Sequence, residues 1–121
     1  MSKKILILDD DKDILEILEL ILTESGYEIH SLTHGNRIFE EIKEFEPDLI
    51  LMDVMLGDLD GLSICKDIKE NPSTSNLTVI LISATNDLNE SLNLPGAPND
   101  YLSKPFDIDI FLAMIGKYLS A

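Results

Sequence analysis

Acidic side chains follow two short apolar runs of the sequence. Asp9 and Asp10 come directly after Ile5–Leu8, and Asp53 comes directly after Leu49–Met52. Clustered carboxylates repel one another, and a hard divalent cation such as Mg2+, which prefers oxygen ligands, removes that repulsion. A metal-bound carboxylate can also attack phosphorus and form an aspartyl phosphate. These aspartates therefore indicate metal-assisted phosphoryl chemistry, provided that the fold brings them together.

A hydroxyl and an ammonium group follow two further apolar segments. Ser83 comes after Thr78–Ile82, and Lys104 comes shortly after Tyr101–Leu102. The ammonium would offset charge on a transferring phosphoryl group, and the hydroxyl can donate a hydrogen bond to one of its oxygens. Taken singly, Asp9 is explained as a helix cap, Ser83 as a turn residue and Lys104 as a surface lysine. The prediction rests on their joint placement.

Apolar runs alternate with amphipathic stretches along the chain, which predicts the elements that position these residues. Strands are expected at Ile5–Leu8, Tyr27–Leu32, Leu49–Met52, Thr78–Ile82 and Tyr101–Leu102. Helices are expected at Asp11–Ser25, Asn36–Glu44, Gly61–Glu70 and Asp107–Leu119. This alternation predicts an α/β fold with a doubly wound, flavodoxin-like parallel sheet of five strands in the order 2-1-3-4-5. Ligands of such sheets bind beyond the carboxyl ends of the strands, where all the residues above are expected.

The spacing of apolar residues also predicts which helix faces are buried. The residues expected to face the core are Ile14, Leu15, Leu18, Ile21, Leu22, Ile38, Phe39, Ile42, Ile110, Phe111, Met114 and Ile115. Gly26 is expected to end the first helix and Asp107 to cap the last one. A fourth helix before the last strand is expected to be weak or short, near Leu88–Leu92, because Asn, Ser, Pro and Gly dominate residues 86–98.

Composition narrows the class of protein. A length of 121 residues fits one domain, and the formal net charge of −14 repels nucleic acid phosphates, so direct nucleic-acid binding is not expected. No run of 18 apolar residues is present, so membrane insertion is not expected either. The single cysteine, Cys65, fits a cytoplasmic protein without disulfides.

The chain resembles a response-regulator receiver domain of two-component signalling over its whole length, residues 1–121. The matching segments are Ile-Leu-Ile-Leu-Asp9-Asp10-Asp11, Asp48-Leu-Ile-Leu-Met-Asp53-Val-Met-Leu, Asp60-Gly61, Ser83-Ala84 and Asp100-Tyr101-Leu-Ser-Lys104-Pro105-Phe106. Each segment is weak evidence alone. Together, in this order and at family-like spacing, they are highly specific.

The resemblance implies a role for each of these residues. It makes Asp53 the phosphoacceptor, Asp10 a direct Mg2+ ligand, Asp9 a ligand mostly through water, Met55 a ligand through its backbone carbonyl, Ser83 and Tyr101 the switch residues and Lys104 the partner of the phosphoryl group. It also implies a cis Lys104–Pro105 bond. The phosphoryl donor would be a sensor histidine kinase, a histidine phosphotransfer protein or a small acyl phosphate. The domain would then change a protein-interaction surface for an unknown downstream protein, and it would not be an enzyme in the ordinary sense.

The sequence departs from the family pattern in three places. Gly57 stands where relatives usually carry proline, and Pro95-Gly96-Ala97-Pro98-Asn99-Asp100 replaces a common Ala-Gly-Ala-Asp-Asp. The spacing from Ser83 to Lys104 is one residue shorter than the commonest form. The charged residues with which many transcription-factor receivers dimerise are not evident, so a monomer or a weak dimer is expected.

The same residues argue against three other classes of protein. A haloacid dehalogenase would need an aspartate at the position of Met55, and a calcium loop would need glycine at Ile14 and glutamate at Leu20. A dinucleotide fold would need glycines where the chain has Asp-Asp-Asp-Lys-Asp. Two alternatives remain open: a docking module that works without phosphorylation, and a receiver excised from a larger response regulator or hybrid kinase.

Overall fold

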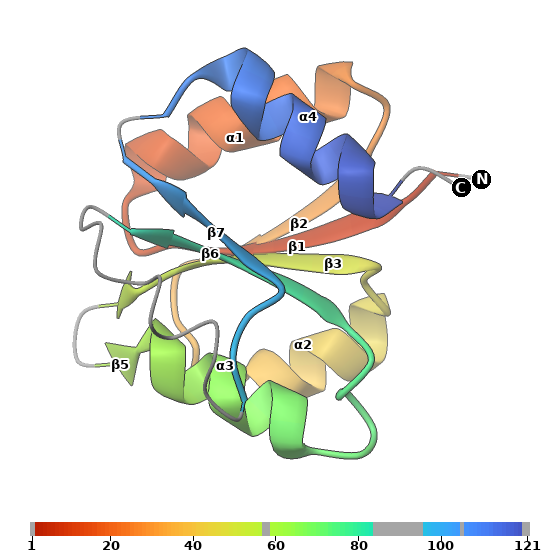
Figure 1. Ribbon diagram of the computed structural model, residues 1–121, viewed down its shortest axis with the longest axis vertical. Helices are drawn as coiled ribbons and strands as arrows, with labels where there is room; N and C mark the ends of the chain where they lie inside the picture. Colours follow the sequence, from red (N-terminus) through yellow and green to blue (C-terminus); the bar gives the residue numbers. More distant parts are fainter. Residues whose placement is uncertain (1, 57–58, 84–95, 105, 120–121) are drawn as a thin grey trace.

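A parallel five-stranded sheet forms the centre of the protein (Figure 1). The computed structural model describes residues 2–56, 59–83, 96–104 and 106–119. The strands are β1 (Lys4–Leu8), β2 (Glu28–Leu32), β3 (Leu49–Asp53), β6 (Thr78–Ser83) and β7 (Asp100–Ser103), and the helices are α1 (Lys12–Glu24), α2 (Ile38–Phe45), α3 (Gly61–Glu70) and α4 (Ile108–Leu119). The strand order β2-β1-β3-β6-β7 confirms the predicted order 2-1-3-4-5 of a flavodoxin-like sheet.

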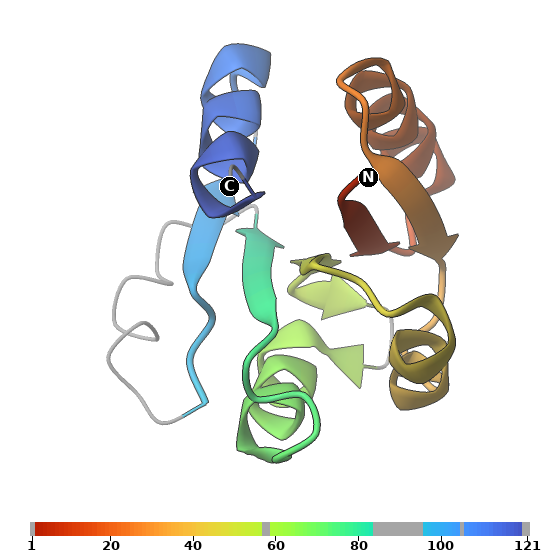
Figure 2. The same cartoon turned by 90° about the vertical axis from the view of Figure 1, so that its right-hand side faces the viewer.

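The helices cover both faces of the sheet. Helices α1 and α4 lie on one face, and α2 and α3 lie on the other (Figures 1 and 2). Successive residues of β1 point to opposite faces of the sheet. Ile5 and Ile7 pack under α1 and α4, whereas Leu6 and Leu8 pack under α2 and α3. A strand that is buried on both sides needs an unbroken apolar run, which is what the sequence shows.

The strand register brings the four chemistry-bearing strand ends to one edge. In β1 and β3, Leu8 lies opposite Met52, and in β3 and β6, Asp53 lies opposite Ile82. Ser83, the last residue of β6, lies opposite Ser103 in β7. All these pairings are parallel, so the residues that end or follow the strands emerge on the same side of the sheet.

Aspartates cap three of the helices, with Asp11 at α1, Asp60 at α3 and Asp107 at α4. The side chain of Asp11 accepts a hydrogen bond from the backbone N–H of Asp13 at 3.0 Å, so Asp11 is the N-cap of α1. Asp107 accepts from the N–H of Asp109 at 2.8 Å, which confirms its predicted capping role. Gly26 follows the C-cap of α1 with φ of +96°, a left-handed conformation that glycine adopts without steric cost. This confirms Gly26 as the end of the helix.

Most of the predicted inward residues lie in the core, but Phe39 and Ile110 do not. Phe39 is 38% exposed and Ile110 is 60% exposed. One residue of helix corresponds to a rotation of roughly 100°. Phe39 therefore leaves the buried stripe that Ile38 and Ile42 define, and Ile110 lies outside the stripe that continues from Phe111. The expectation of an inward side chain was wrong at these two positions.

Asn99 fixes the start of β7 against β6. Its backbone N–H donates to the carbonyl of Val79 at 2.8 Å, and its side-chain Oδ1 accepts from the N–H of Val79 at 2.9 Å. The Tyr118 hydroxyl of α4 donates to the carbonyl of Asn99 and lies within hydrogen-bonding distance of Asp100 Oδ2, both at 3.0 Å. The beginning of the edge strand β7 is therefore hydrogen-bonded both to β6 and to α4.

A short hairpin was not predicted. Strands β4 (Met55–Leu56) and β5 (Leu59–Asp60) pair antiparallel between β3 and α3. The expected weak helix near Leu88–Leu92, the loop at Gly57 and the cis Lys104–Pro105 bond lie outside the described residues. Of the helices in the described part of the chain, none combines the length and apolar character needed to cross a membrane.

The thiol of Cys65 should be protected by the fold. Cys65 is fully buried in α3, and burial raises its pKa to about 11. At pH 8 its thiolate fraction is then on the order of 100-fold below that of an exposed cysteine. We expect iodoacetamide to leave the folded protein unmodified and to alkylate it rapidly in urea, as followed by mass spectrometry. Fast alkylation of the folded protein would contradict this packing.

Candidate functional site

Three carboxylates gather at the carboxyl edge of the sheet. Asp9, Asp10 and Asp53 each offer an oxygen, and these oxygens all lie within 4.8 Å of one another. Asp9 and Asp53 are buried, whereas Asp10 is exposed. The cluster therefore has a buried floor and one side that is open to solvent.

Asp9 has one satisfied oxygen and one without a hydrogen bond. Its Oδ1 accepts from the N–H of Asp11 at 2.9 Å. Its Oδ2 is buried and has no hydrogen-bond partner among the described residues. Burial raises the pKa of Asp9, and the nearby charge of Asp53 adds to that effect, while the hydrogen bond from Asp11 works against it. A buried carboxylate oxygen without a donor is costly, and a cation satisfies it, so the donor set fits a hard divalent metal.

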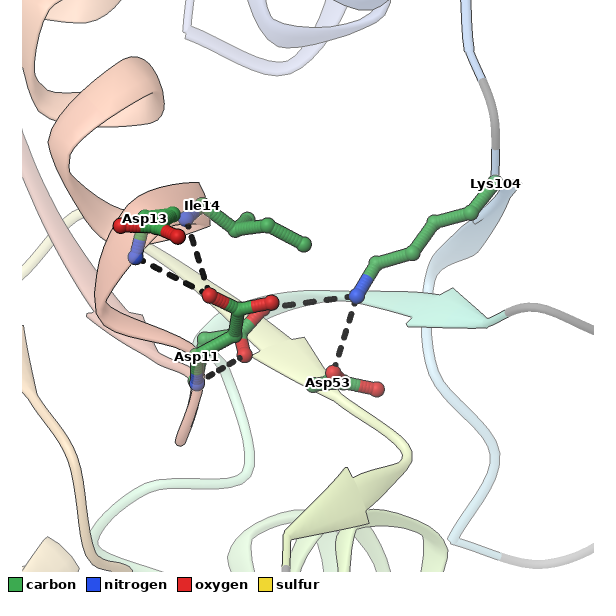
Figure 3. Close-up of polar contacts among 6 residues, drawn as sticks. Asp11, Asp13, Ile14, Asp53 and Lys104 are labelled. Atoms are coloured by element: carbon green, nitrogen blue, oxygen red, sulfur yellow. Dashed lines mark hydrogen bonds and ion pairs between the residues drawn. The ribbon is translucent and has the colours of Figure 1, made fainter.

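Lys104 supplies positive charge to the cluster. Its Nζ lies 3.0 Å from Oδ2 of Asp53, within hydrogen-bonding distance, and 3.6 Å from Oδ2 of Asp9, which makes an ion pair without a hydrogen bond (Figure 3). Burial lowers the pKa of Lys104, but the hydrogen bond to Asp53 and the charges of Asp9 and Asp53 outweigh it and raise the pKa. The side chain therefore stays charged. Its backbone N–H also donates to the carbonyl of Ser83 at 2.7 Å, which fixes where the chain leaves β7.

Ser83 and Tyr101 lie on the opposite face of the sheet from Asp53. Asp53 continues the series of β3 residues that pack under α1 and α4, whereas Tyr101 packs against the cluster under α2 and α3. Tyr101 pairs with Leu81, and Ser83 lies two residues further along the same face of β6. The two side chains are therefore diagonal neighbours on one face of the paired strands β6 and β7. Ser83 still ends at the same sheet edge as Asp53.

The turn after Asp53 depends on Gly61. The N–H of Gly61 donates to the carbonyl of Val54 at 2.8 Å, and the N–H of Val54 donates to the carbonyl of Ile82 at 3.0 Å. A Cβ atom on Gly61 would clash with the carbonyl oxygen of Asp53 and would lie 2.9 Å from Cα of Val54. The backbone of α3 therefore packs directly on the segment that carries Asp53.

Sequence reasoning found four of the clustered side chains and missed two supporting residues. The structure brings Asp9, Asp10, Asp53 and Lys104 together. The backbone of Met55 begins β4, two residues after Asp53. The backbone of Asp11, which holds Asp9, was not anticipated, and Gly61 was noted only as part of a matching motif. Its steric role appears only once β3 and α3 are placed in space.

Comparison with known proteins points to the same family as the sequence motifs. Residues 5–116 match the response regulator receiver domain. A two-component response regulator from Clostridium difficile shares 30% identity, with 98% of this chain and 96% of that chain covered and a TM-score of 0.86. The signal receiver domain of a histidine kinase from Syntrophus aciditrophicus shares 28% identity, with coverage of 98% and 91% and a TM-score of 0.87. The BeF3-activated receiver domain of DrrB shares 30% identity over all of both chains, with a TM-score of 0.83.

Replacing Gly61 with alanine should destabilise the protein. The new methyl group would displace the backbone of Asp53 or Val54, and such overpacking costs about 1–3 kcal/mol in the free energy of unfolding. Gly116 in α4 is the matched control, because a Cβ there meets nothing within 4 Å. Gly116→Ala should stabilise the protein by about 0.4–1 kcal/mol. Urea unfolding of both variants checks this, and equal changes in the two would refute the close approach at Gly61.

Proposed function

Because the chain belongs to the response regulator receiver family, we propose that Asp53 accepts a phosphoryl group from a phosphohistidine. The donor would be a sensor histidine kinase or a histidine phosphotransfer protein. The observation that carries this proposal is the pairing of Lys104 with Asp53 inside a cluster of three carboxylates. We extend the proposal to residues 1–121 as one receiver domain.

The side chains of the cluster suit nucleophilic attack on phosphorus. A carboxylate oxygen of Asp53 would form a bond to phosphorus while the bond from phosphorus to the donor nitrogen breaks. The electron pair of that bond stays on the donor imidazole, which leaves as a neutral ring when its other nitrogen is protonated. Lys104, held 3.0 Å from Asp53, would pair with the charged phosphoryl oxygens as they arrive.

The acidic residues would also hold Mg2+. We assign direct coordination to Asp10, Asp53 and the backbone carbonyl of Met55, with Asp9 acting mostly through water. The buried, unbonded Oδ2 of Asp9 supports a cation at this place. When bound, Mg2+ neutralises charge on the carboxylates and on the phosphoryl oxygens.

Ser83 and Tyr101 would convert phosphorylation into a change of surface. Ser83 would donate to a phosphoryl oxygen, and Tyr101, its neighbour on the same face, would fill the space behind it. A swing from 1:99 to 99:1 between two states needs about 5.5 kcal/mol. One charged hydrogen bond supplies roughly 1.5–3 kcal/mol. Ser83 alone is therefore insufficient, and Lys104 and Mg2+ would have to contribute.

The proposed role also implies where the protein acts, in what oligomeric state and with which partners. Receiver domains act in signalling with histidine kinases or phosphotransfer proteins and are not ordinary enzymes. We place the protein in the cytoplasm as a monomer or weak dimer that acts on a downstream protein. One comparison structure is the receiver of a histidine kinase, so an origin in a larger protein stays an alternative to a stand-alone regulator.

Incubation with acetyl phosphate and Mg2+ should add one phosphoryl group to the protein. Asp53→Asn should abolish the addition, because the nucleophilic oxygen is lost, and EDTA should strongly slow it. Asp67→Asn, at an exposed position of α3, is the control and should react like the native protein. Intact-protein mass spectrometry gives the measurement. Undiminished modification of Asp53→Asn would show that the acceptor is a different residue.

Lys104→Ala should separate metal binding from the response to phosphorylation. The carboxylates remain, so a Mg2+ titration followed by NMR should still show binding. The phosphoryl group would lose its ammonium partner, so beryllofluoride should no longer shift the amide signals of Ser83 and Tyr101 as it does in the native protein. A response equal to that of the native protein would argue against this role of Lys104.

A further inference from the structure

One side of α2 and the segment that follows α3 border a pocket. The two helices lie on the same face of the sheet (Figures 1 and 2). The pocket has a volume of about 560 Å3, and its apolar lining includes Phe39, Ile42, Pro47 and Leu77. Pockets of roughly 300–1,000 Å3 are typical of sites for small organic molecules. We call this hollow the α2 pocket.

The α2 pocket lies at the opposite end of the sheet from the acidic cluster. Pro47 and Leu77 line it just before β3 and β6 begin, whereas Asp53 and Ser83 are the last residues of those strands. A strand of this length spans roughly 13 Å, which is too far for one small ligand to contact both places. The proposed phosphorylation of Asp53 therefore does not account for this pocket.

Glu46 lines the α2 pocket in an unfavourable backbone conformation. It caps the C-terminal end of α2 with φ of 54° and ψ of 59°, which is the left-handed region. In the described part of the chain, it is the one residue other than glycine with positive φ. Glycine or asparagine is usual at such a cap, because a larger side chain is disfavoured there. A glutamate that is kept at this position, beside a pocket, indicates that its carboxylate has a use.

The electrostatics of the α2 pocket favour a positive charge. The C-caps of two helices, Glu46 of α2 and Asn71 of α3, line it, and the C-terminal end of a helix carries a partial negative charge. The carboxylate of Glu46 adds a full negative charge. Lys43, at the same rim, is the opposing charge, and both side chains are exposed. Neither of them forms an ion pair with another described residue, so both are available to a ligand.

Hydrogen bonds fix the wall of the pocket that follows α3. Oδ1 of Asn71 accepts from the backbone N–H of Ser73 at 3.0 Å. The buried hydroxyl of Thr74 donates to the carbonyl of Ile68 at 2.6 Å, and the N–H of Leu77 donates to the carbonyl of Thr74 at 3.0 Å. Because this wall is already ordered, a ligand does not have to order it on binding.

We propose that the α2 pocket binds a small organic cation, namely a protonated amine attached to an aromatic body. The ammonium group lies against the carboxylate of Glu46 and the helix ends, and the aromatic body packs on Phe39 and Leu77. Phe39 is 38% exposed, and such a ligand covers it. An anion of the same shape is disfavoured, because it meets Glu46 and the negative ends of two helices.

The test uses phenethylamine as the probe. Its controls are phenylacetate, which replaces the ammonium group with a carboxylate, and ethylamine, which lacks the ring. NMR titration of the native protein, with Mg2+ present to occupy the acidic cluster, should shift amides near the end of α2 and in residues 71–77 with phenethylamine. Both controls should bind at least about fivefold more weakly. Equal binding of either control, shifts elsewhere, or no shifts at all would overturn the proposal.

Charge variants separate the pocket from general attraction to an acidic protein. Glu46→Gln should weaken phenethylamine binding about fivefold, because it removes the carboxylate and keeps the shape of the side chain. Glu44→Gln is the matched control, since Glu44 is an exposed acid of α2 outside the pocket lining. Lys43→Gln should strengthen binding about twofold by removing the opposing charge. Equal weakening by Glu44→Gln, or weaker binding by Lys43→Gln, would refute the assignment.

Glu46→Gly gives opposite changes in stability and in binding if the carboxylate is kept for a ligand. Glycine suits the left-handed backbone, so the urea midpoint should rise, while phenethylamine binding should fall as in Glu46→Gln. A lower midpoint, or binding equal to that of the native protein, would contradict this role of Glu46. Phe39→Ala should also weaken binding, whereas Ile17→Ala, at an exposed apolar position of α1, should not. Equal effects of these two variants would overturn the placement of the aromatic body.

Discussion

The balance of charge at one edge of the sheet is the constraint on which the site depends. Three carboxylates meet there, and one ammonium group, from Lys104, lies within ion-pairing distance of two of them. At 3.0 Å and an effective dielectric constant of about 20, one such attraction is worth on the order of 5 kcal/mol before desolvation is counted. One positive charge cannot neutralise three negative ones. Burial raises the pKa of Asp9, and the negative charge of Asp53 raises it further, while the excess negative charge of the cluster suits this edge to a divalent cation.

The fold holds this repulsive arrangement with backbone contacts around it. The N–H of Asp11 fixes one oxygen of Asp9, while the side chain of Asp11 begins α1. The absence of a side chain at Gly61 lets α3 pack on the backbone of Asp53. The carbonyl of Ser83 accepts a hydrogen bond from the backbone N–H of Lys104, which fixes the backbone position of Lys104 at the end of β7. Strand pairing and helix capping together offset the cost of gathering like charges.

The sequence was sufficient for the arrangement of the sheet and for most of the clustered site. Apolar runs that stop at charged residues define the strand ends, and parallel topology then brings Asp9, Asp53 and Lys104 to one edge. The apolar pattern did not separate buried from exposed positions near the helix ends. Phe39 and Ile110 are each apolar and each adjoin a core residue, but a rotation of one residue along the helix turns them toward solvent. The packing of Gly61 and the unbonded oxygen of Asp9 depend on distances between elements, which residue types alone do not contain.

The fastening of β7 at Asn99 has a mechanical consequence. The strand is joined to β6 by two hydrogen bonds at Val79 and to α4 through Tyr118, all at the end opposite Lys104. The N–H of Lys104 also donates to the carbonyl of Ser83 at 2.7 Å, so β7 is held to β6 at both of its ends. A force on the Lys104 side chain is therefore resisted by hydrogen bonds at both ends of β7, and Tyr118 links the Asn99 end of the strand to α4.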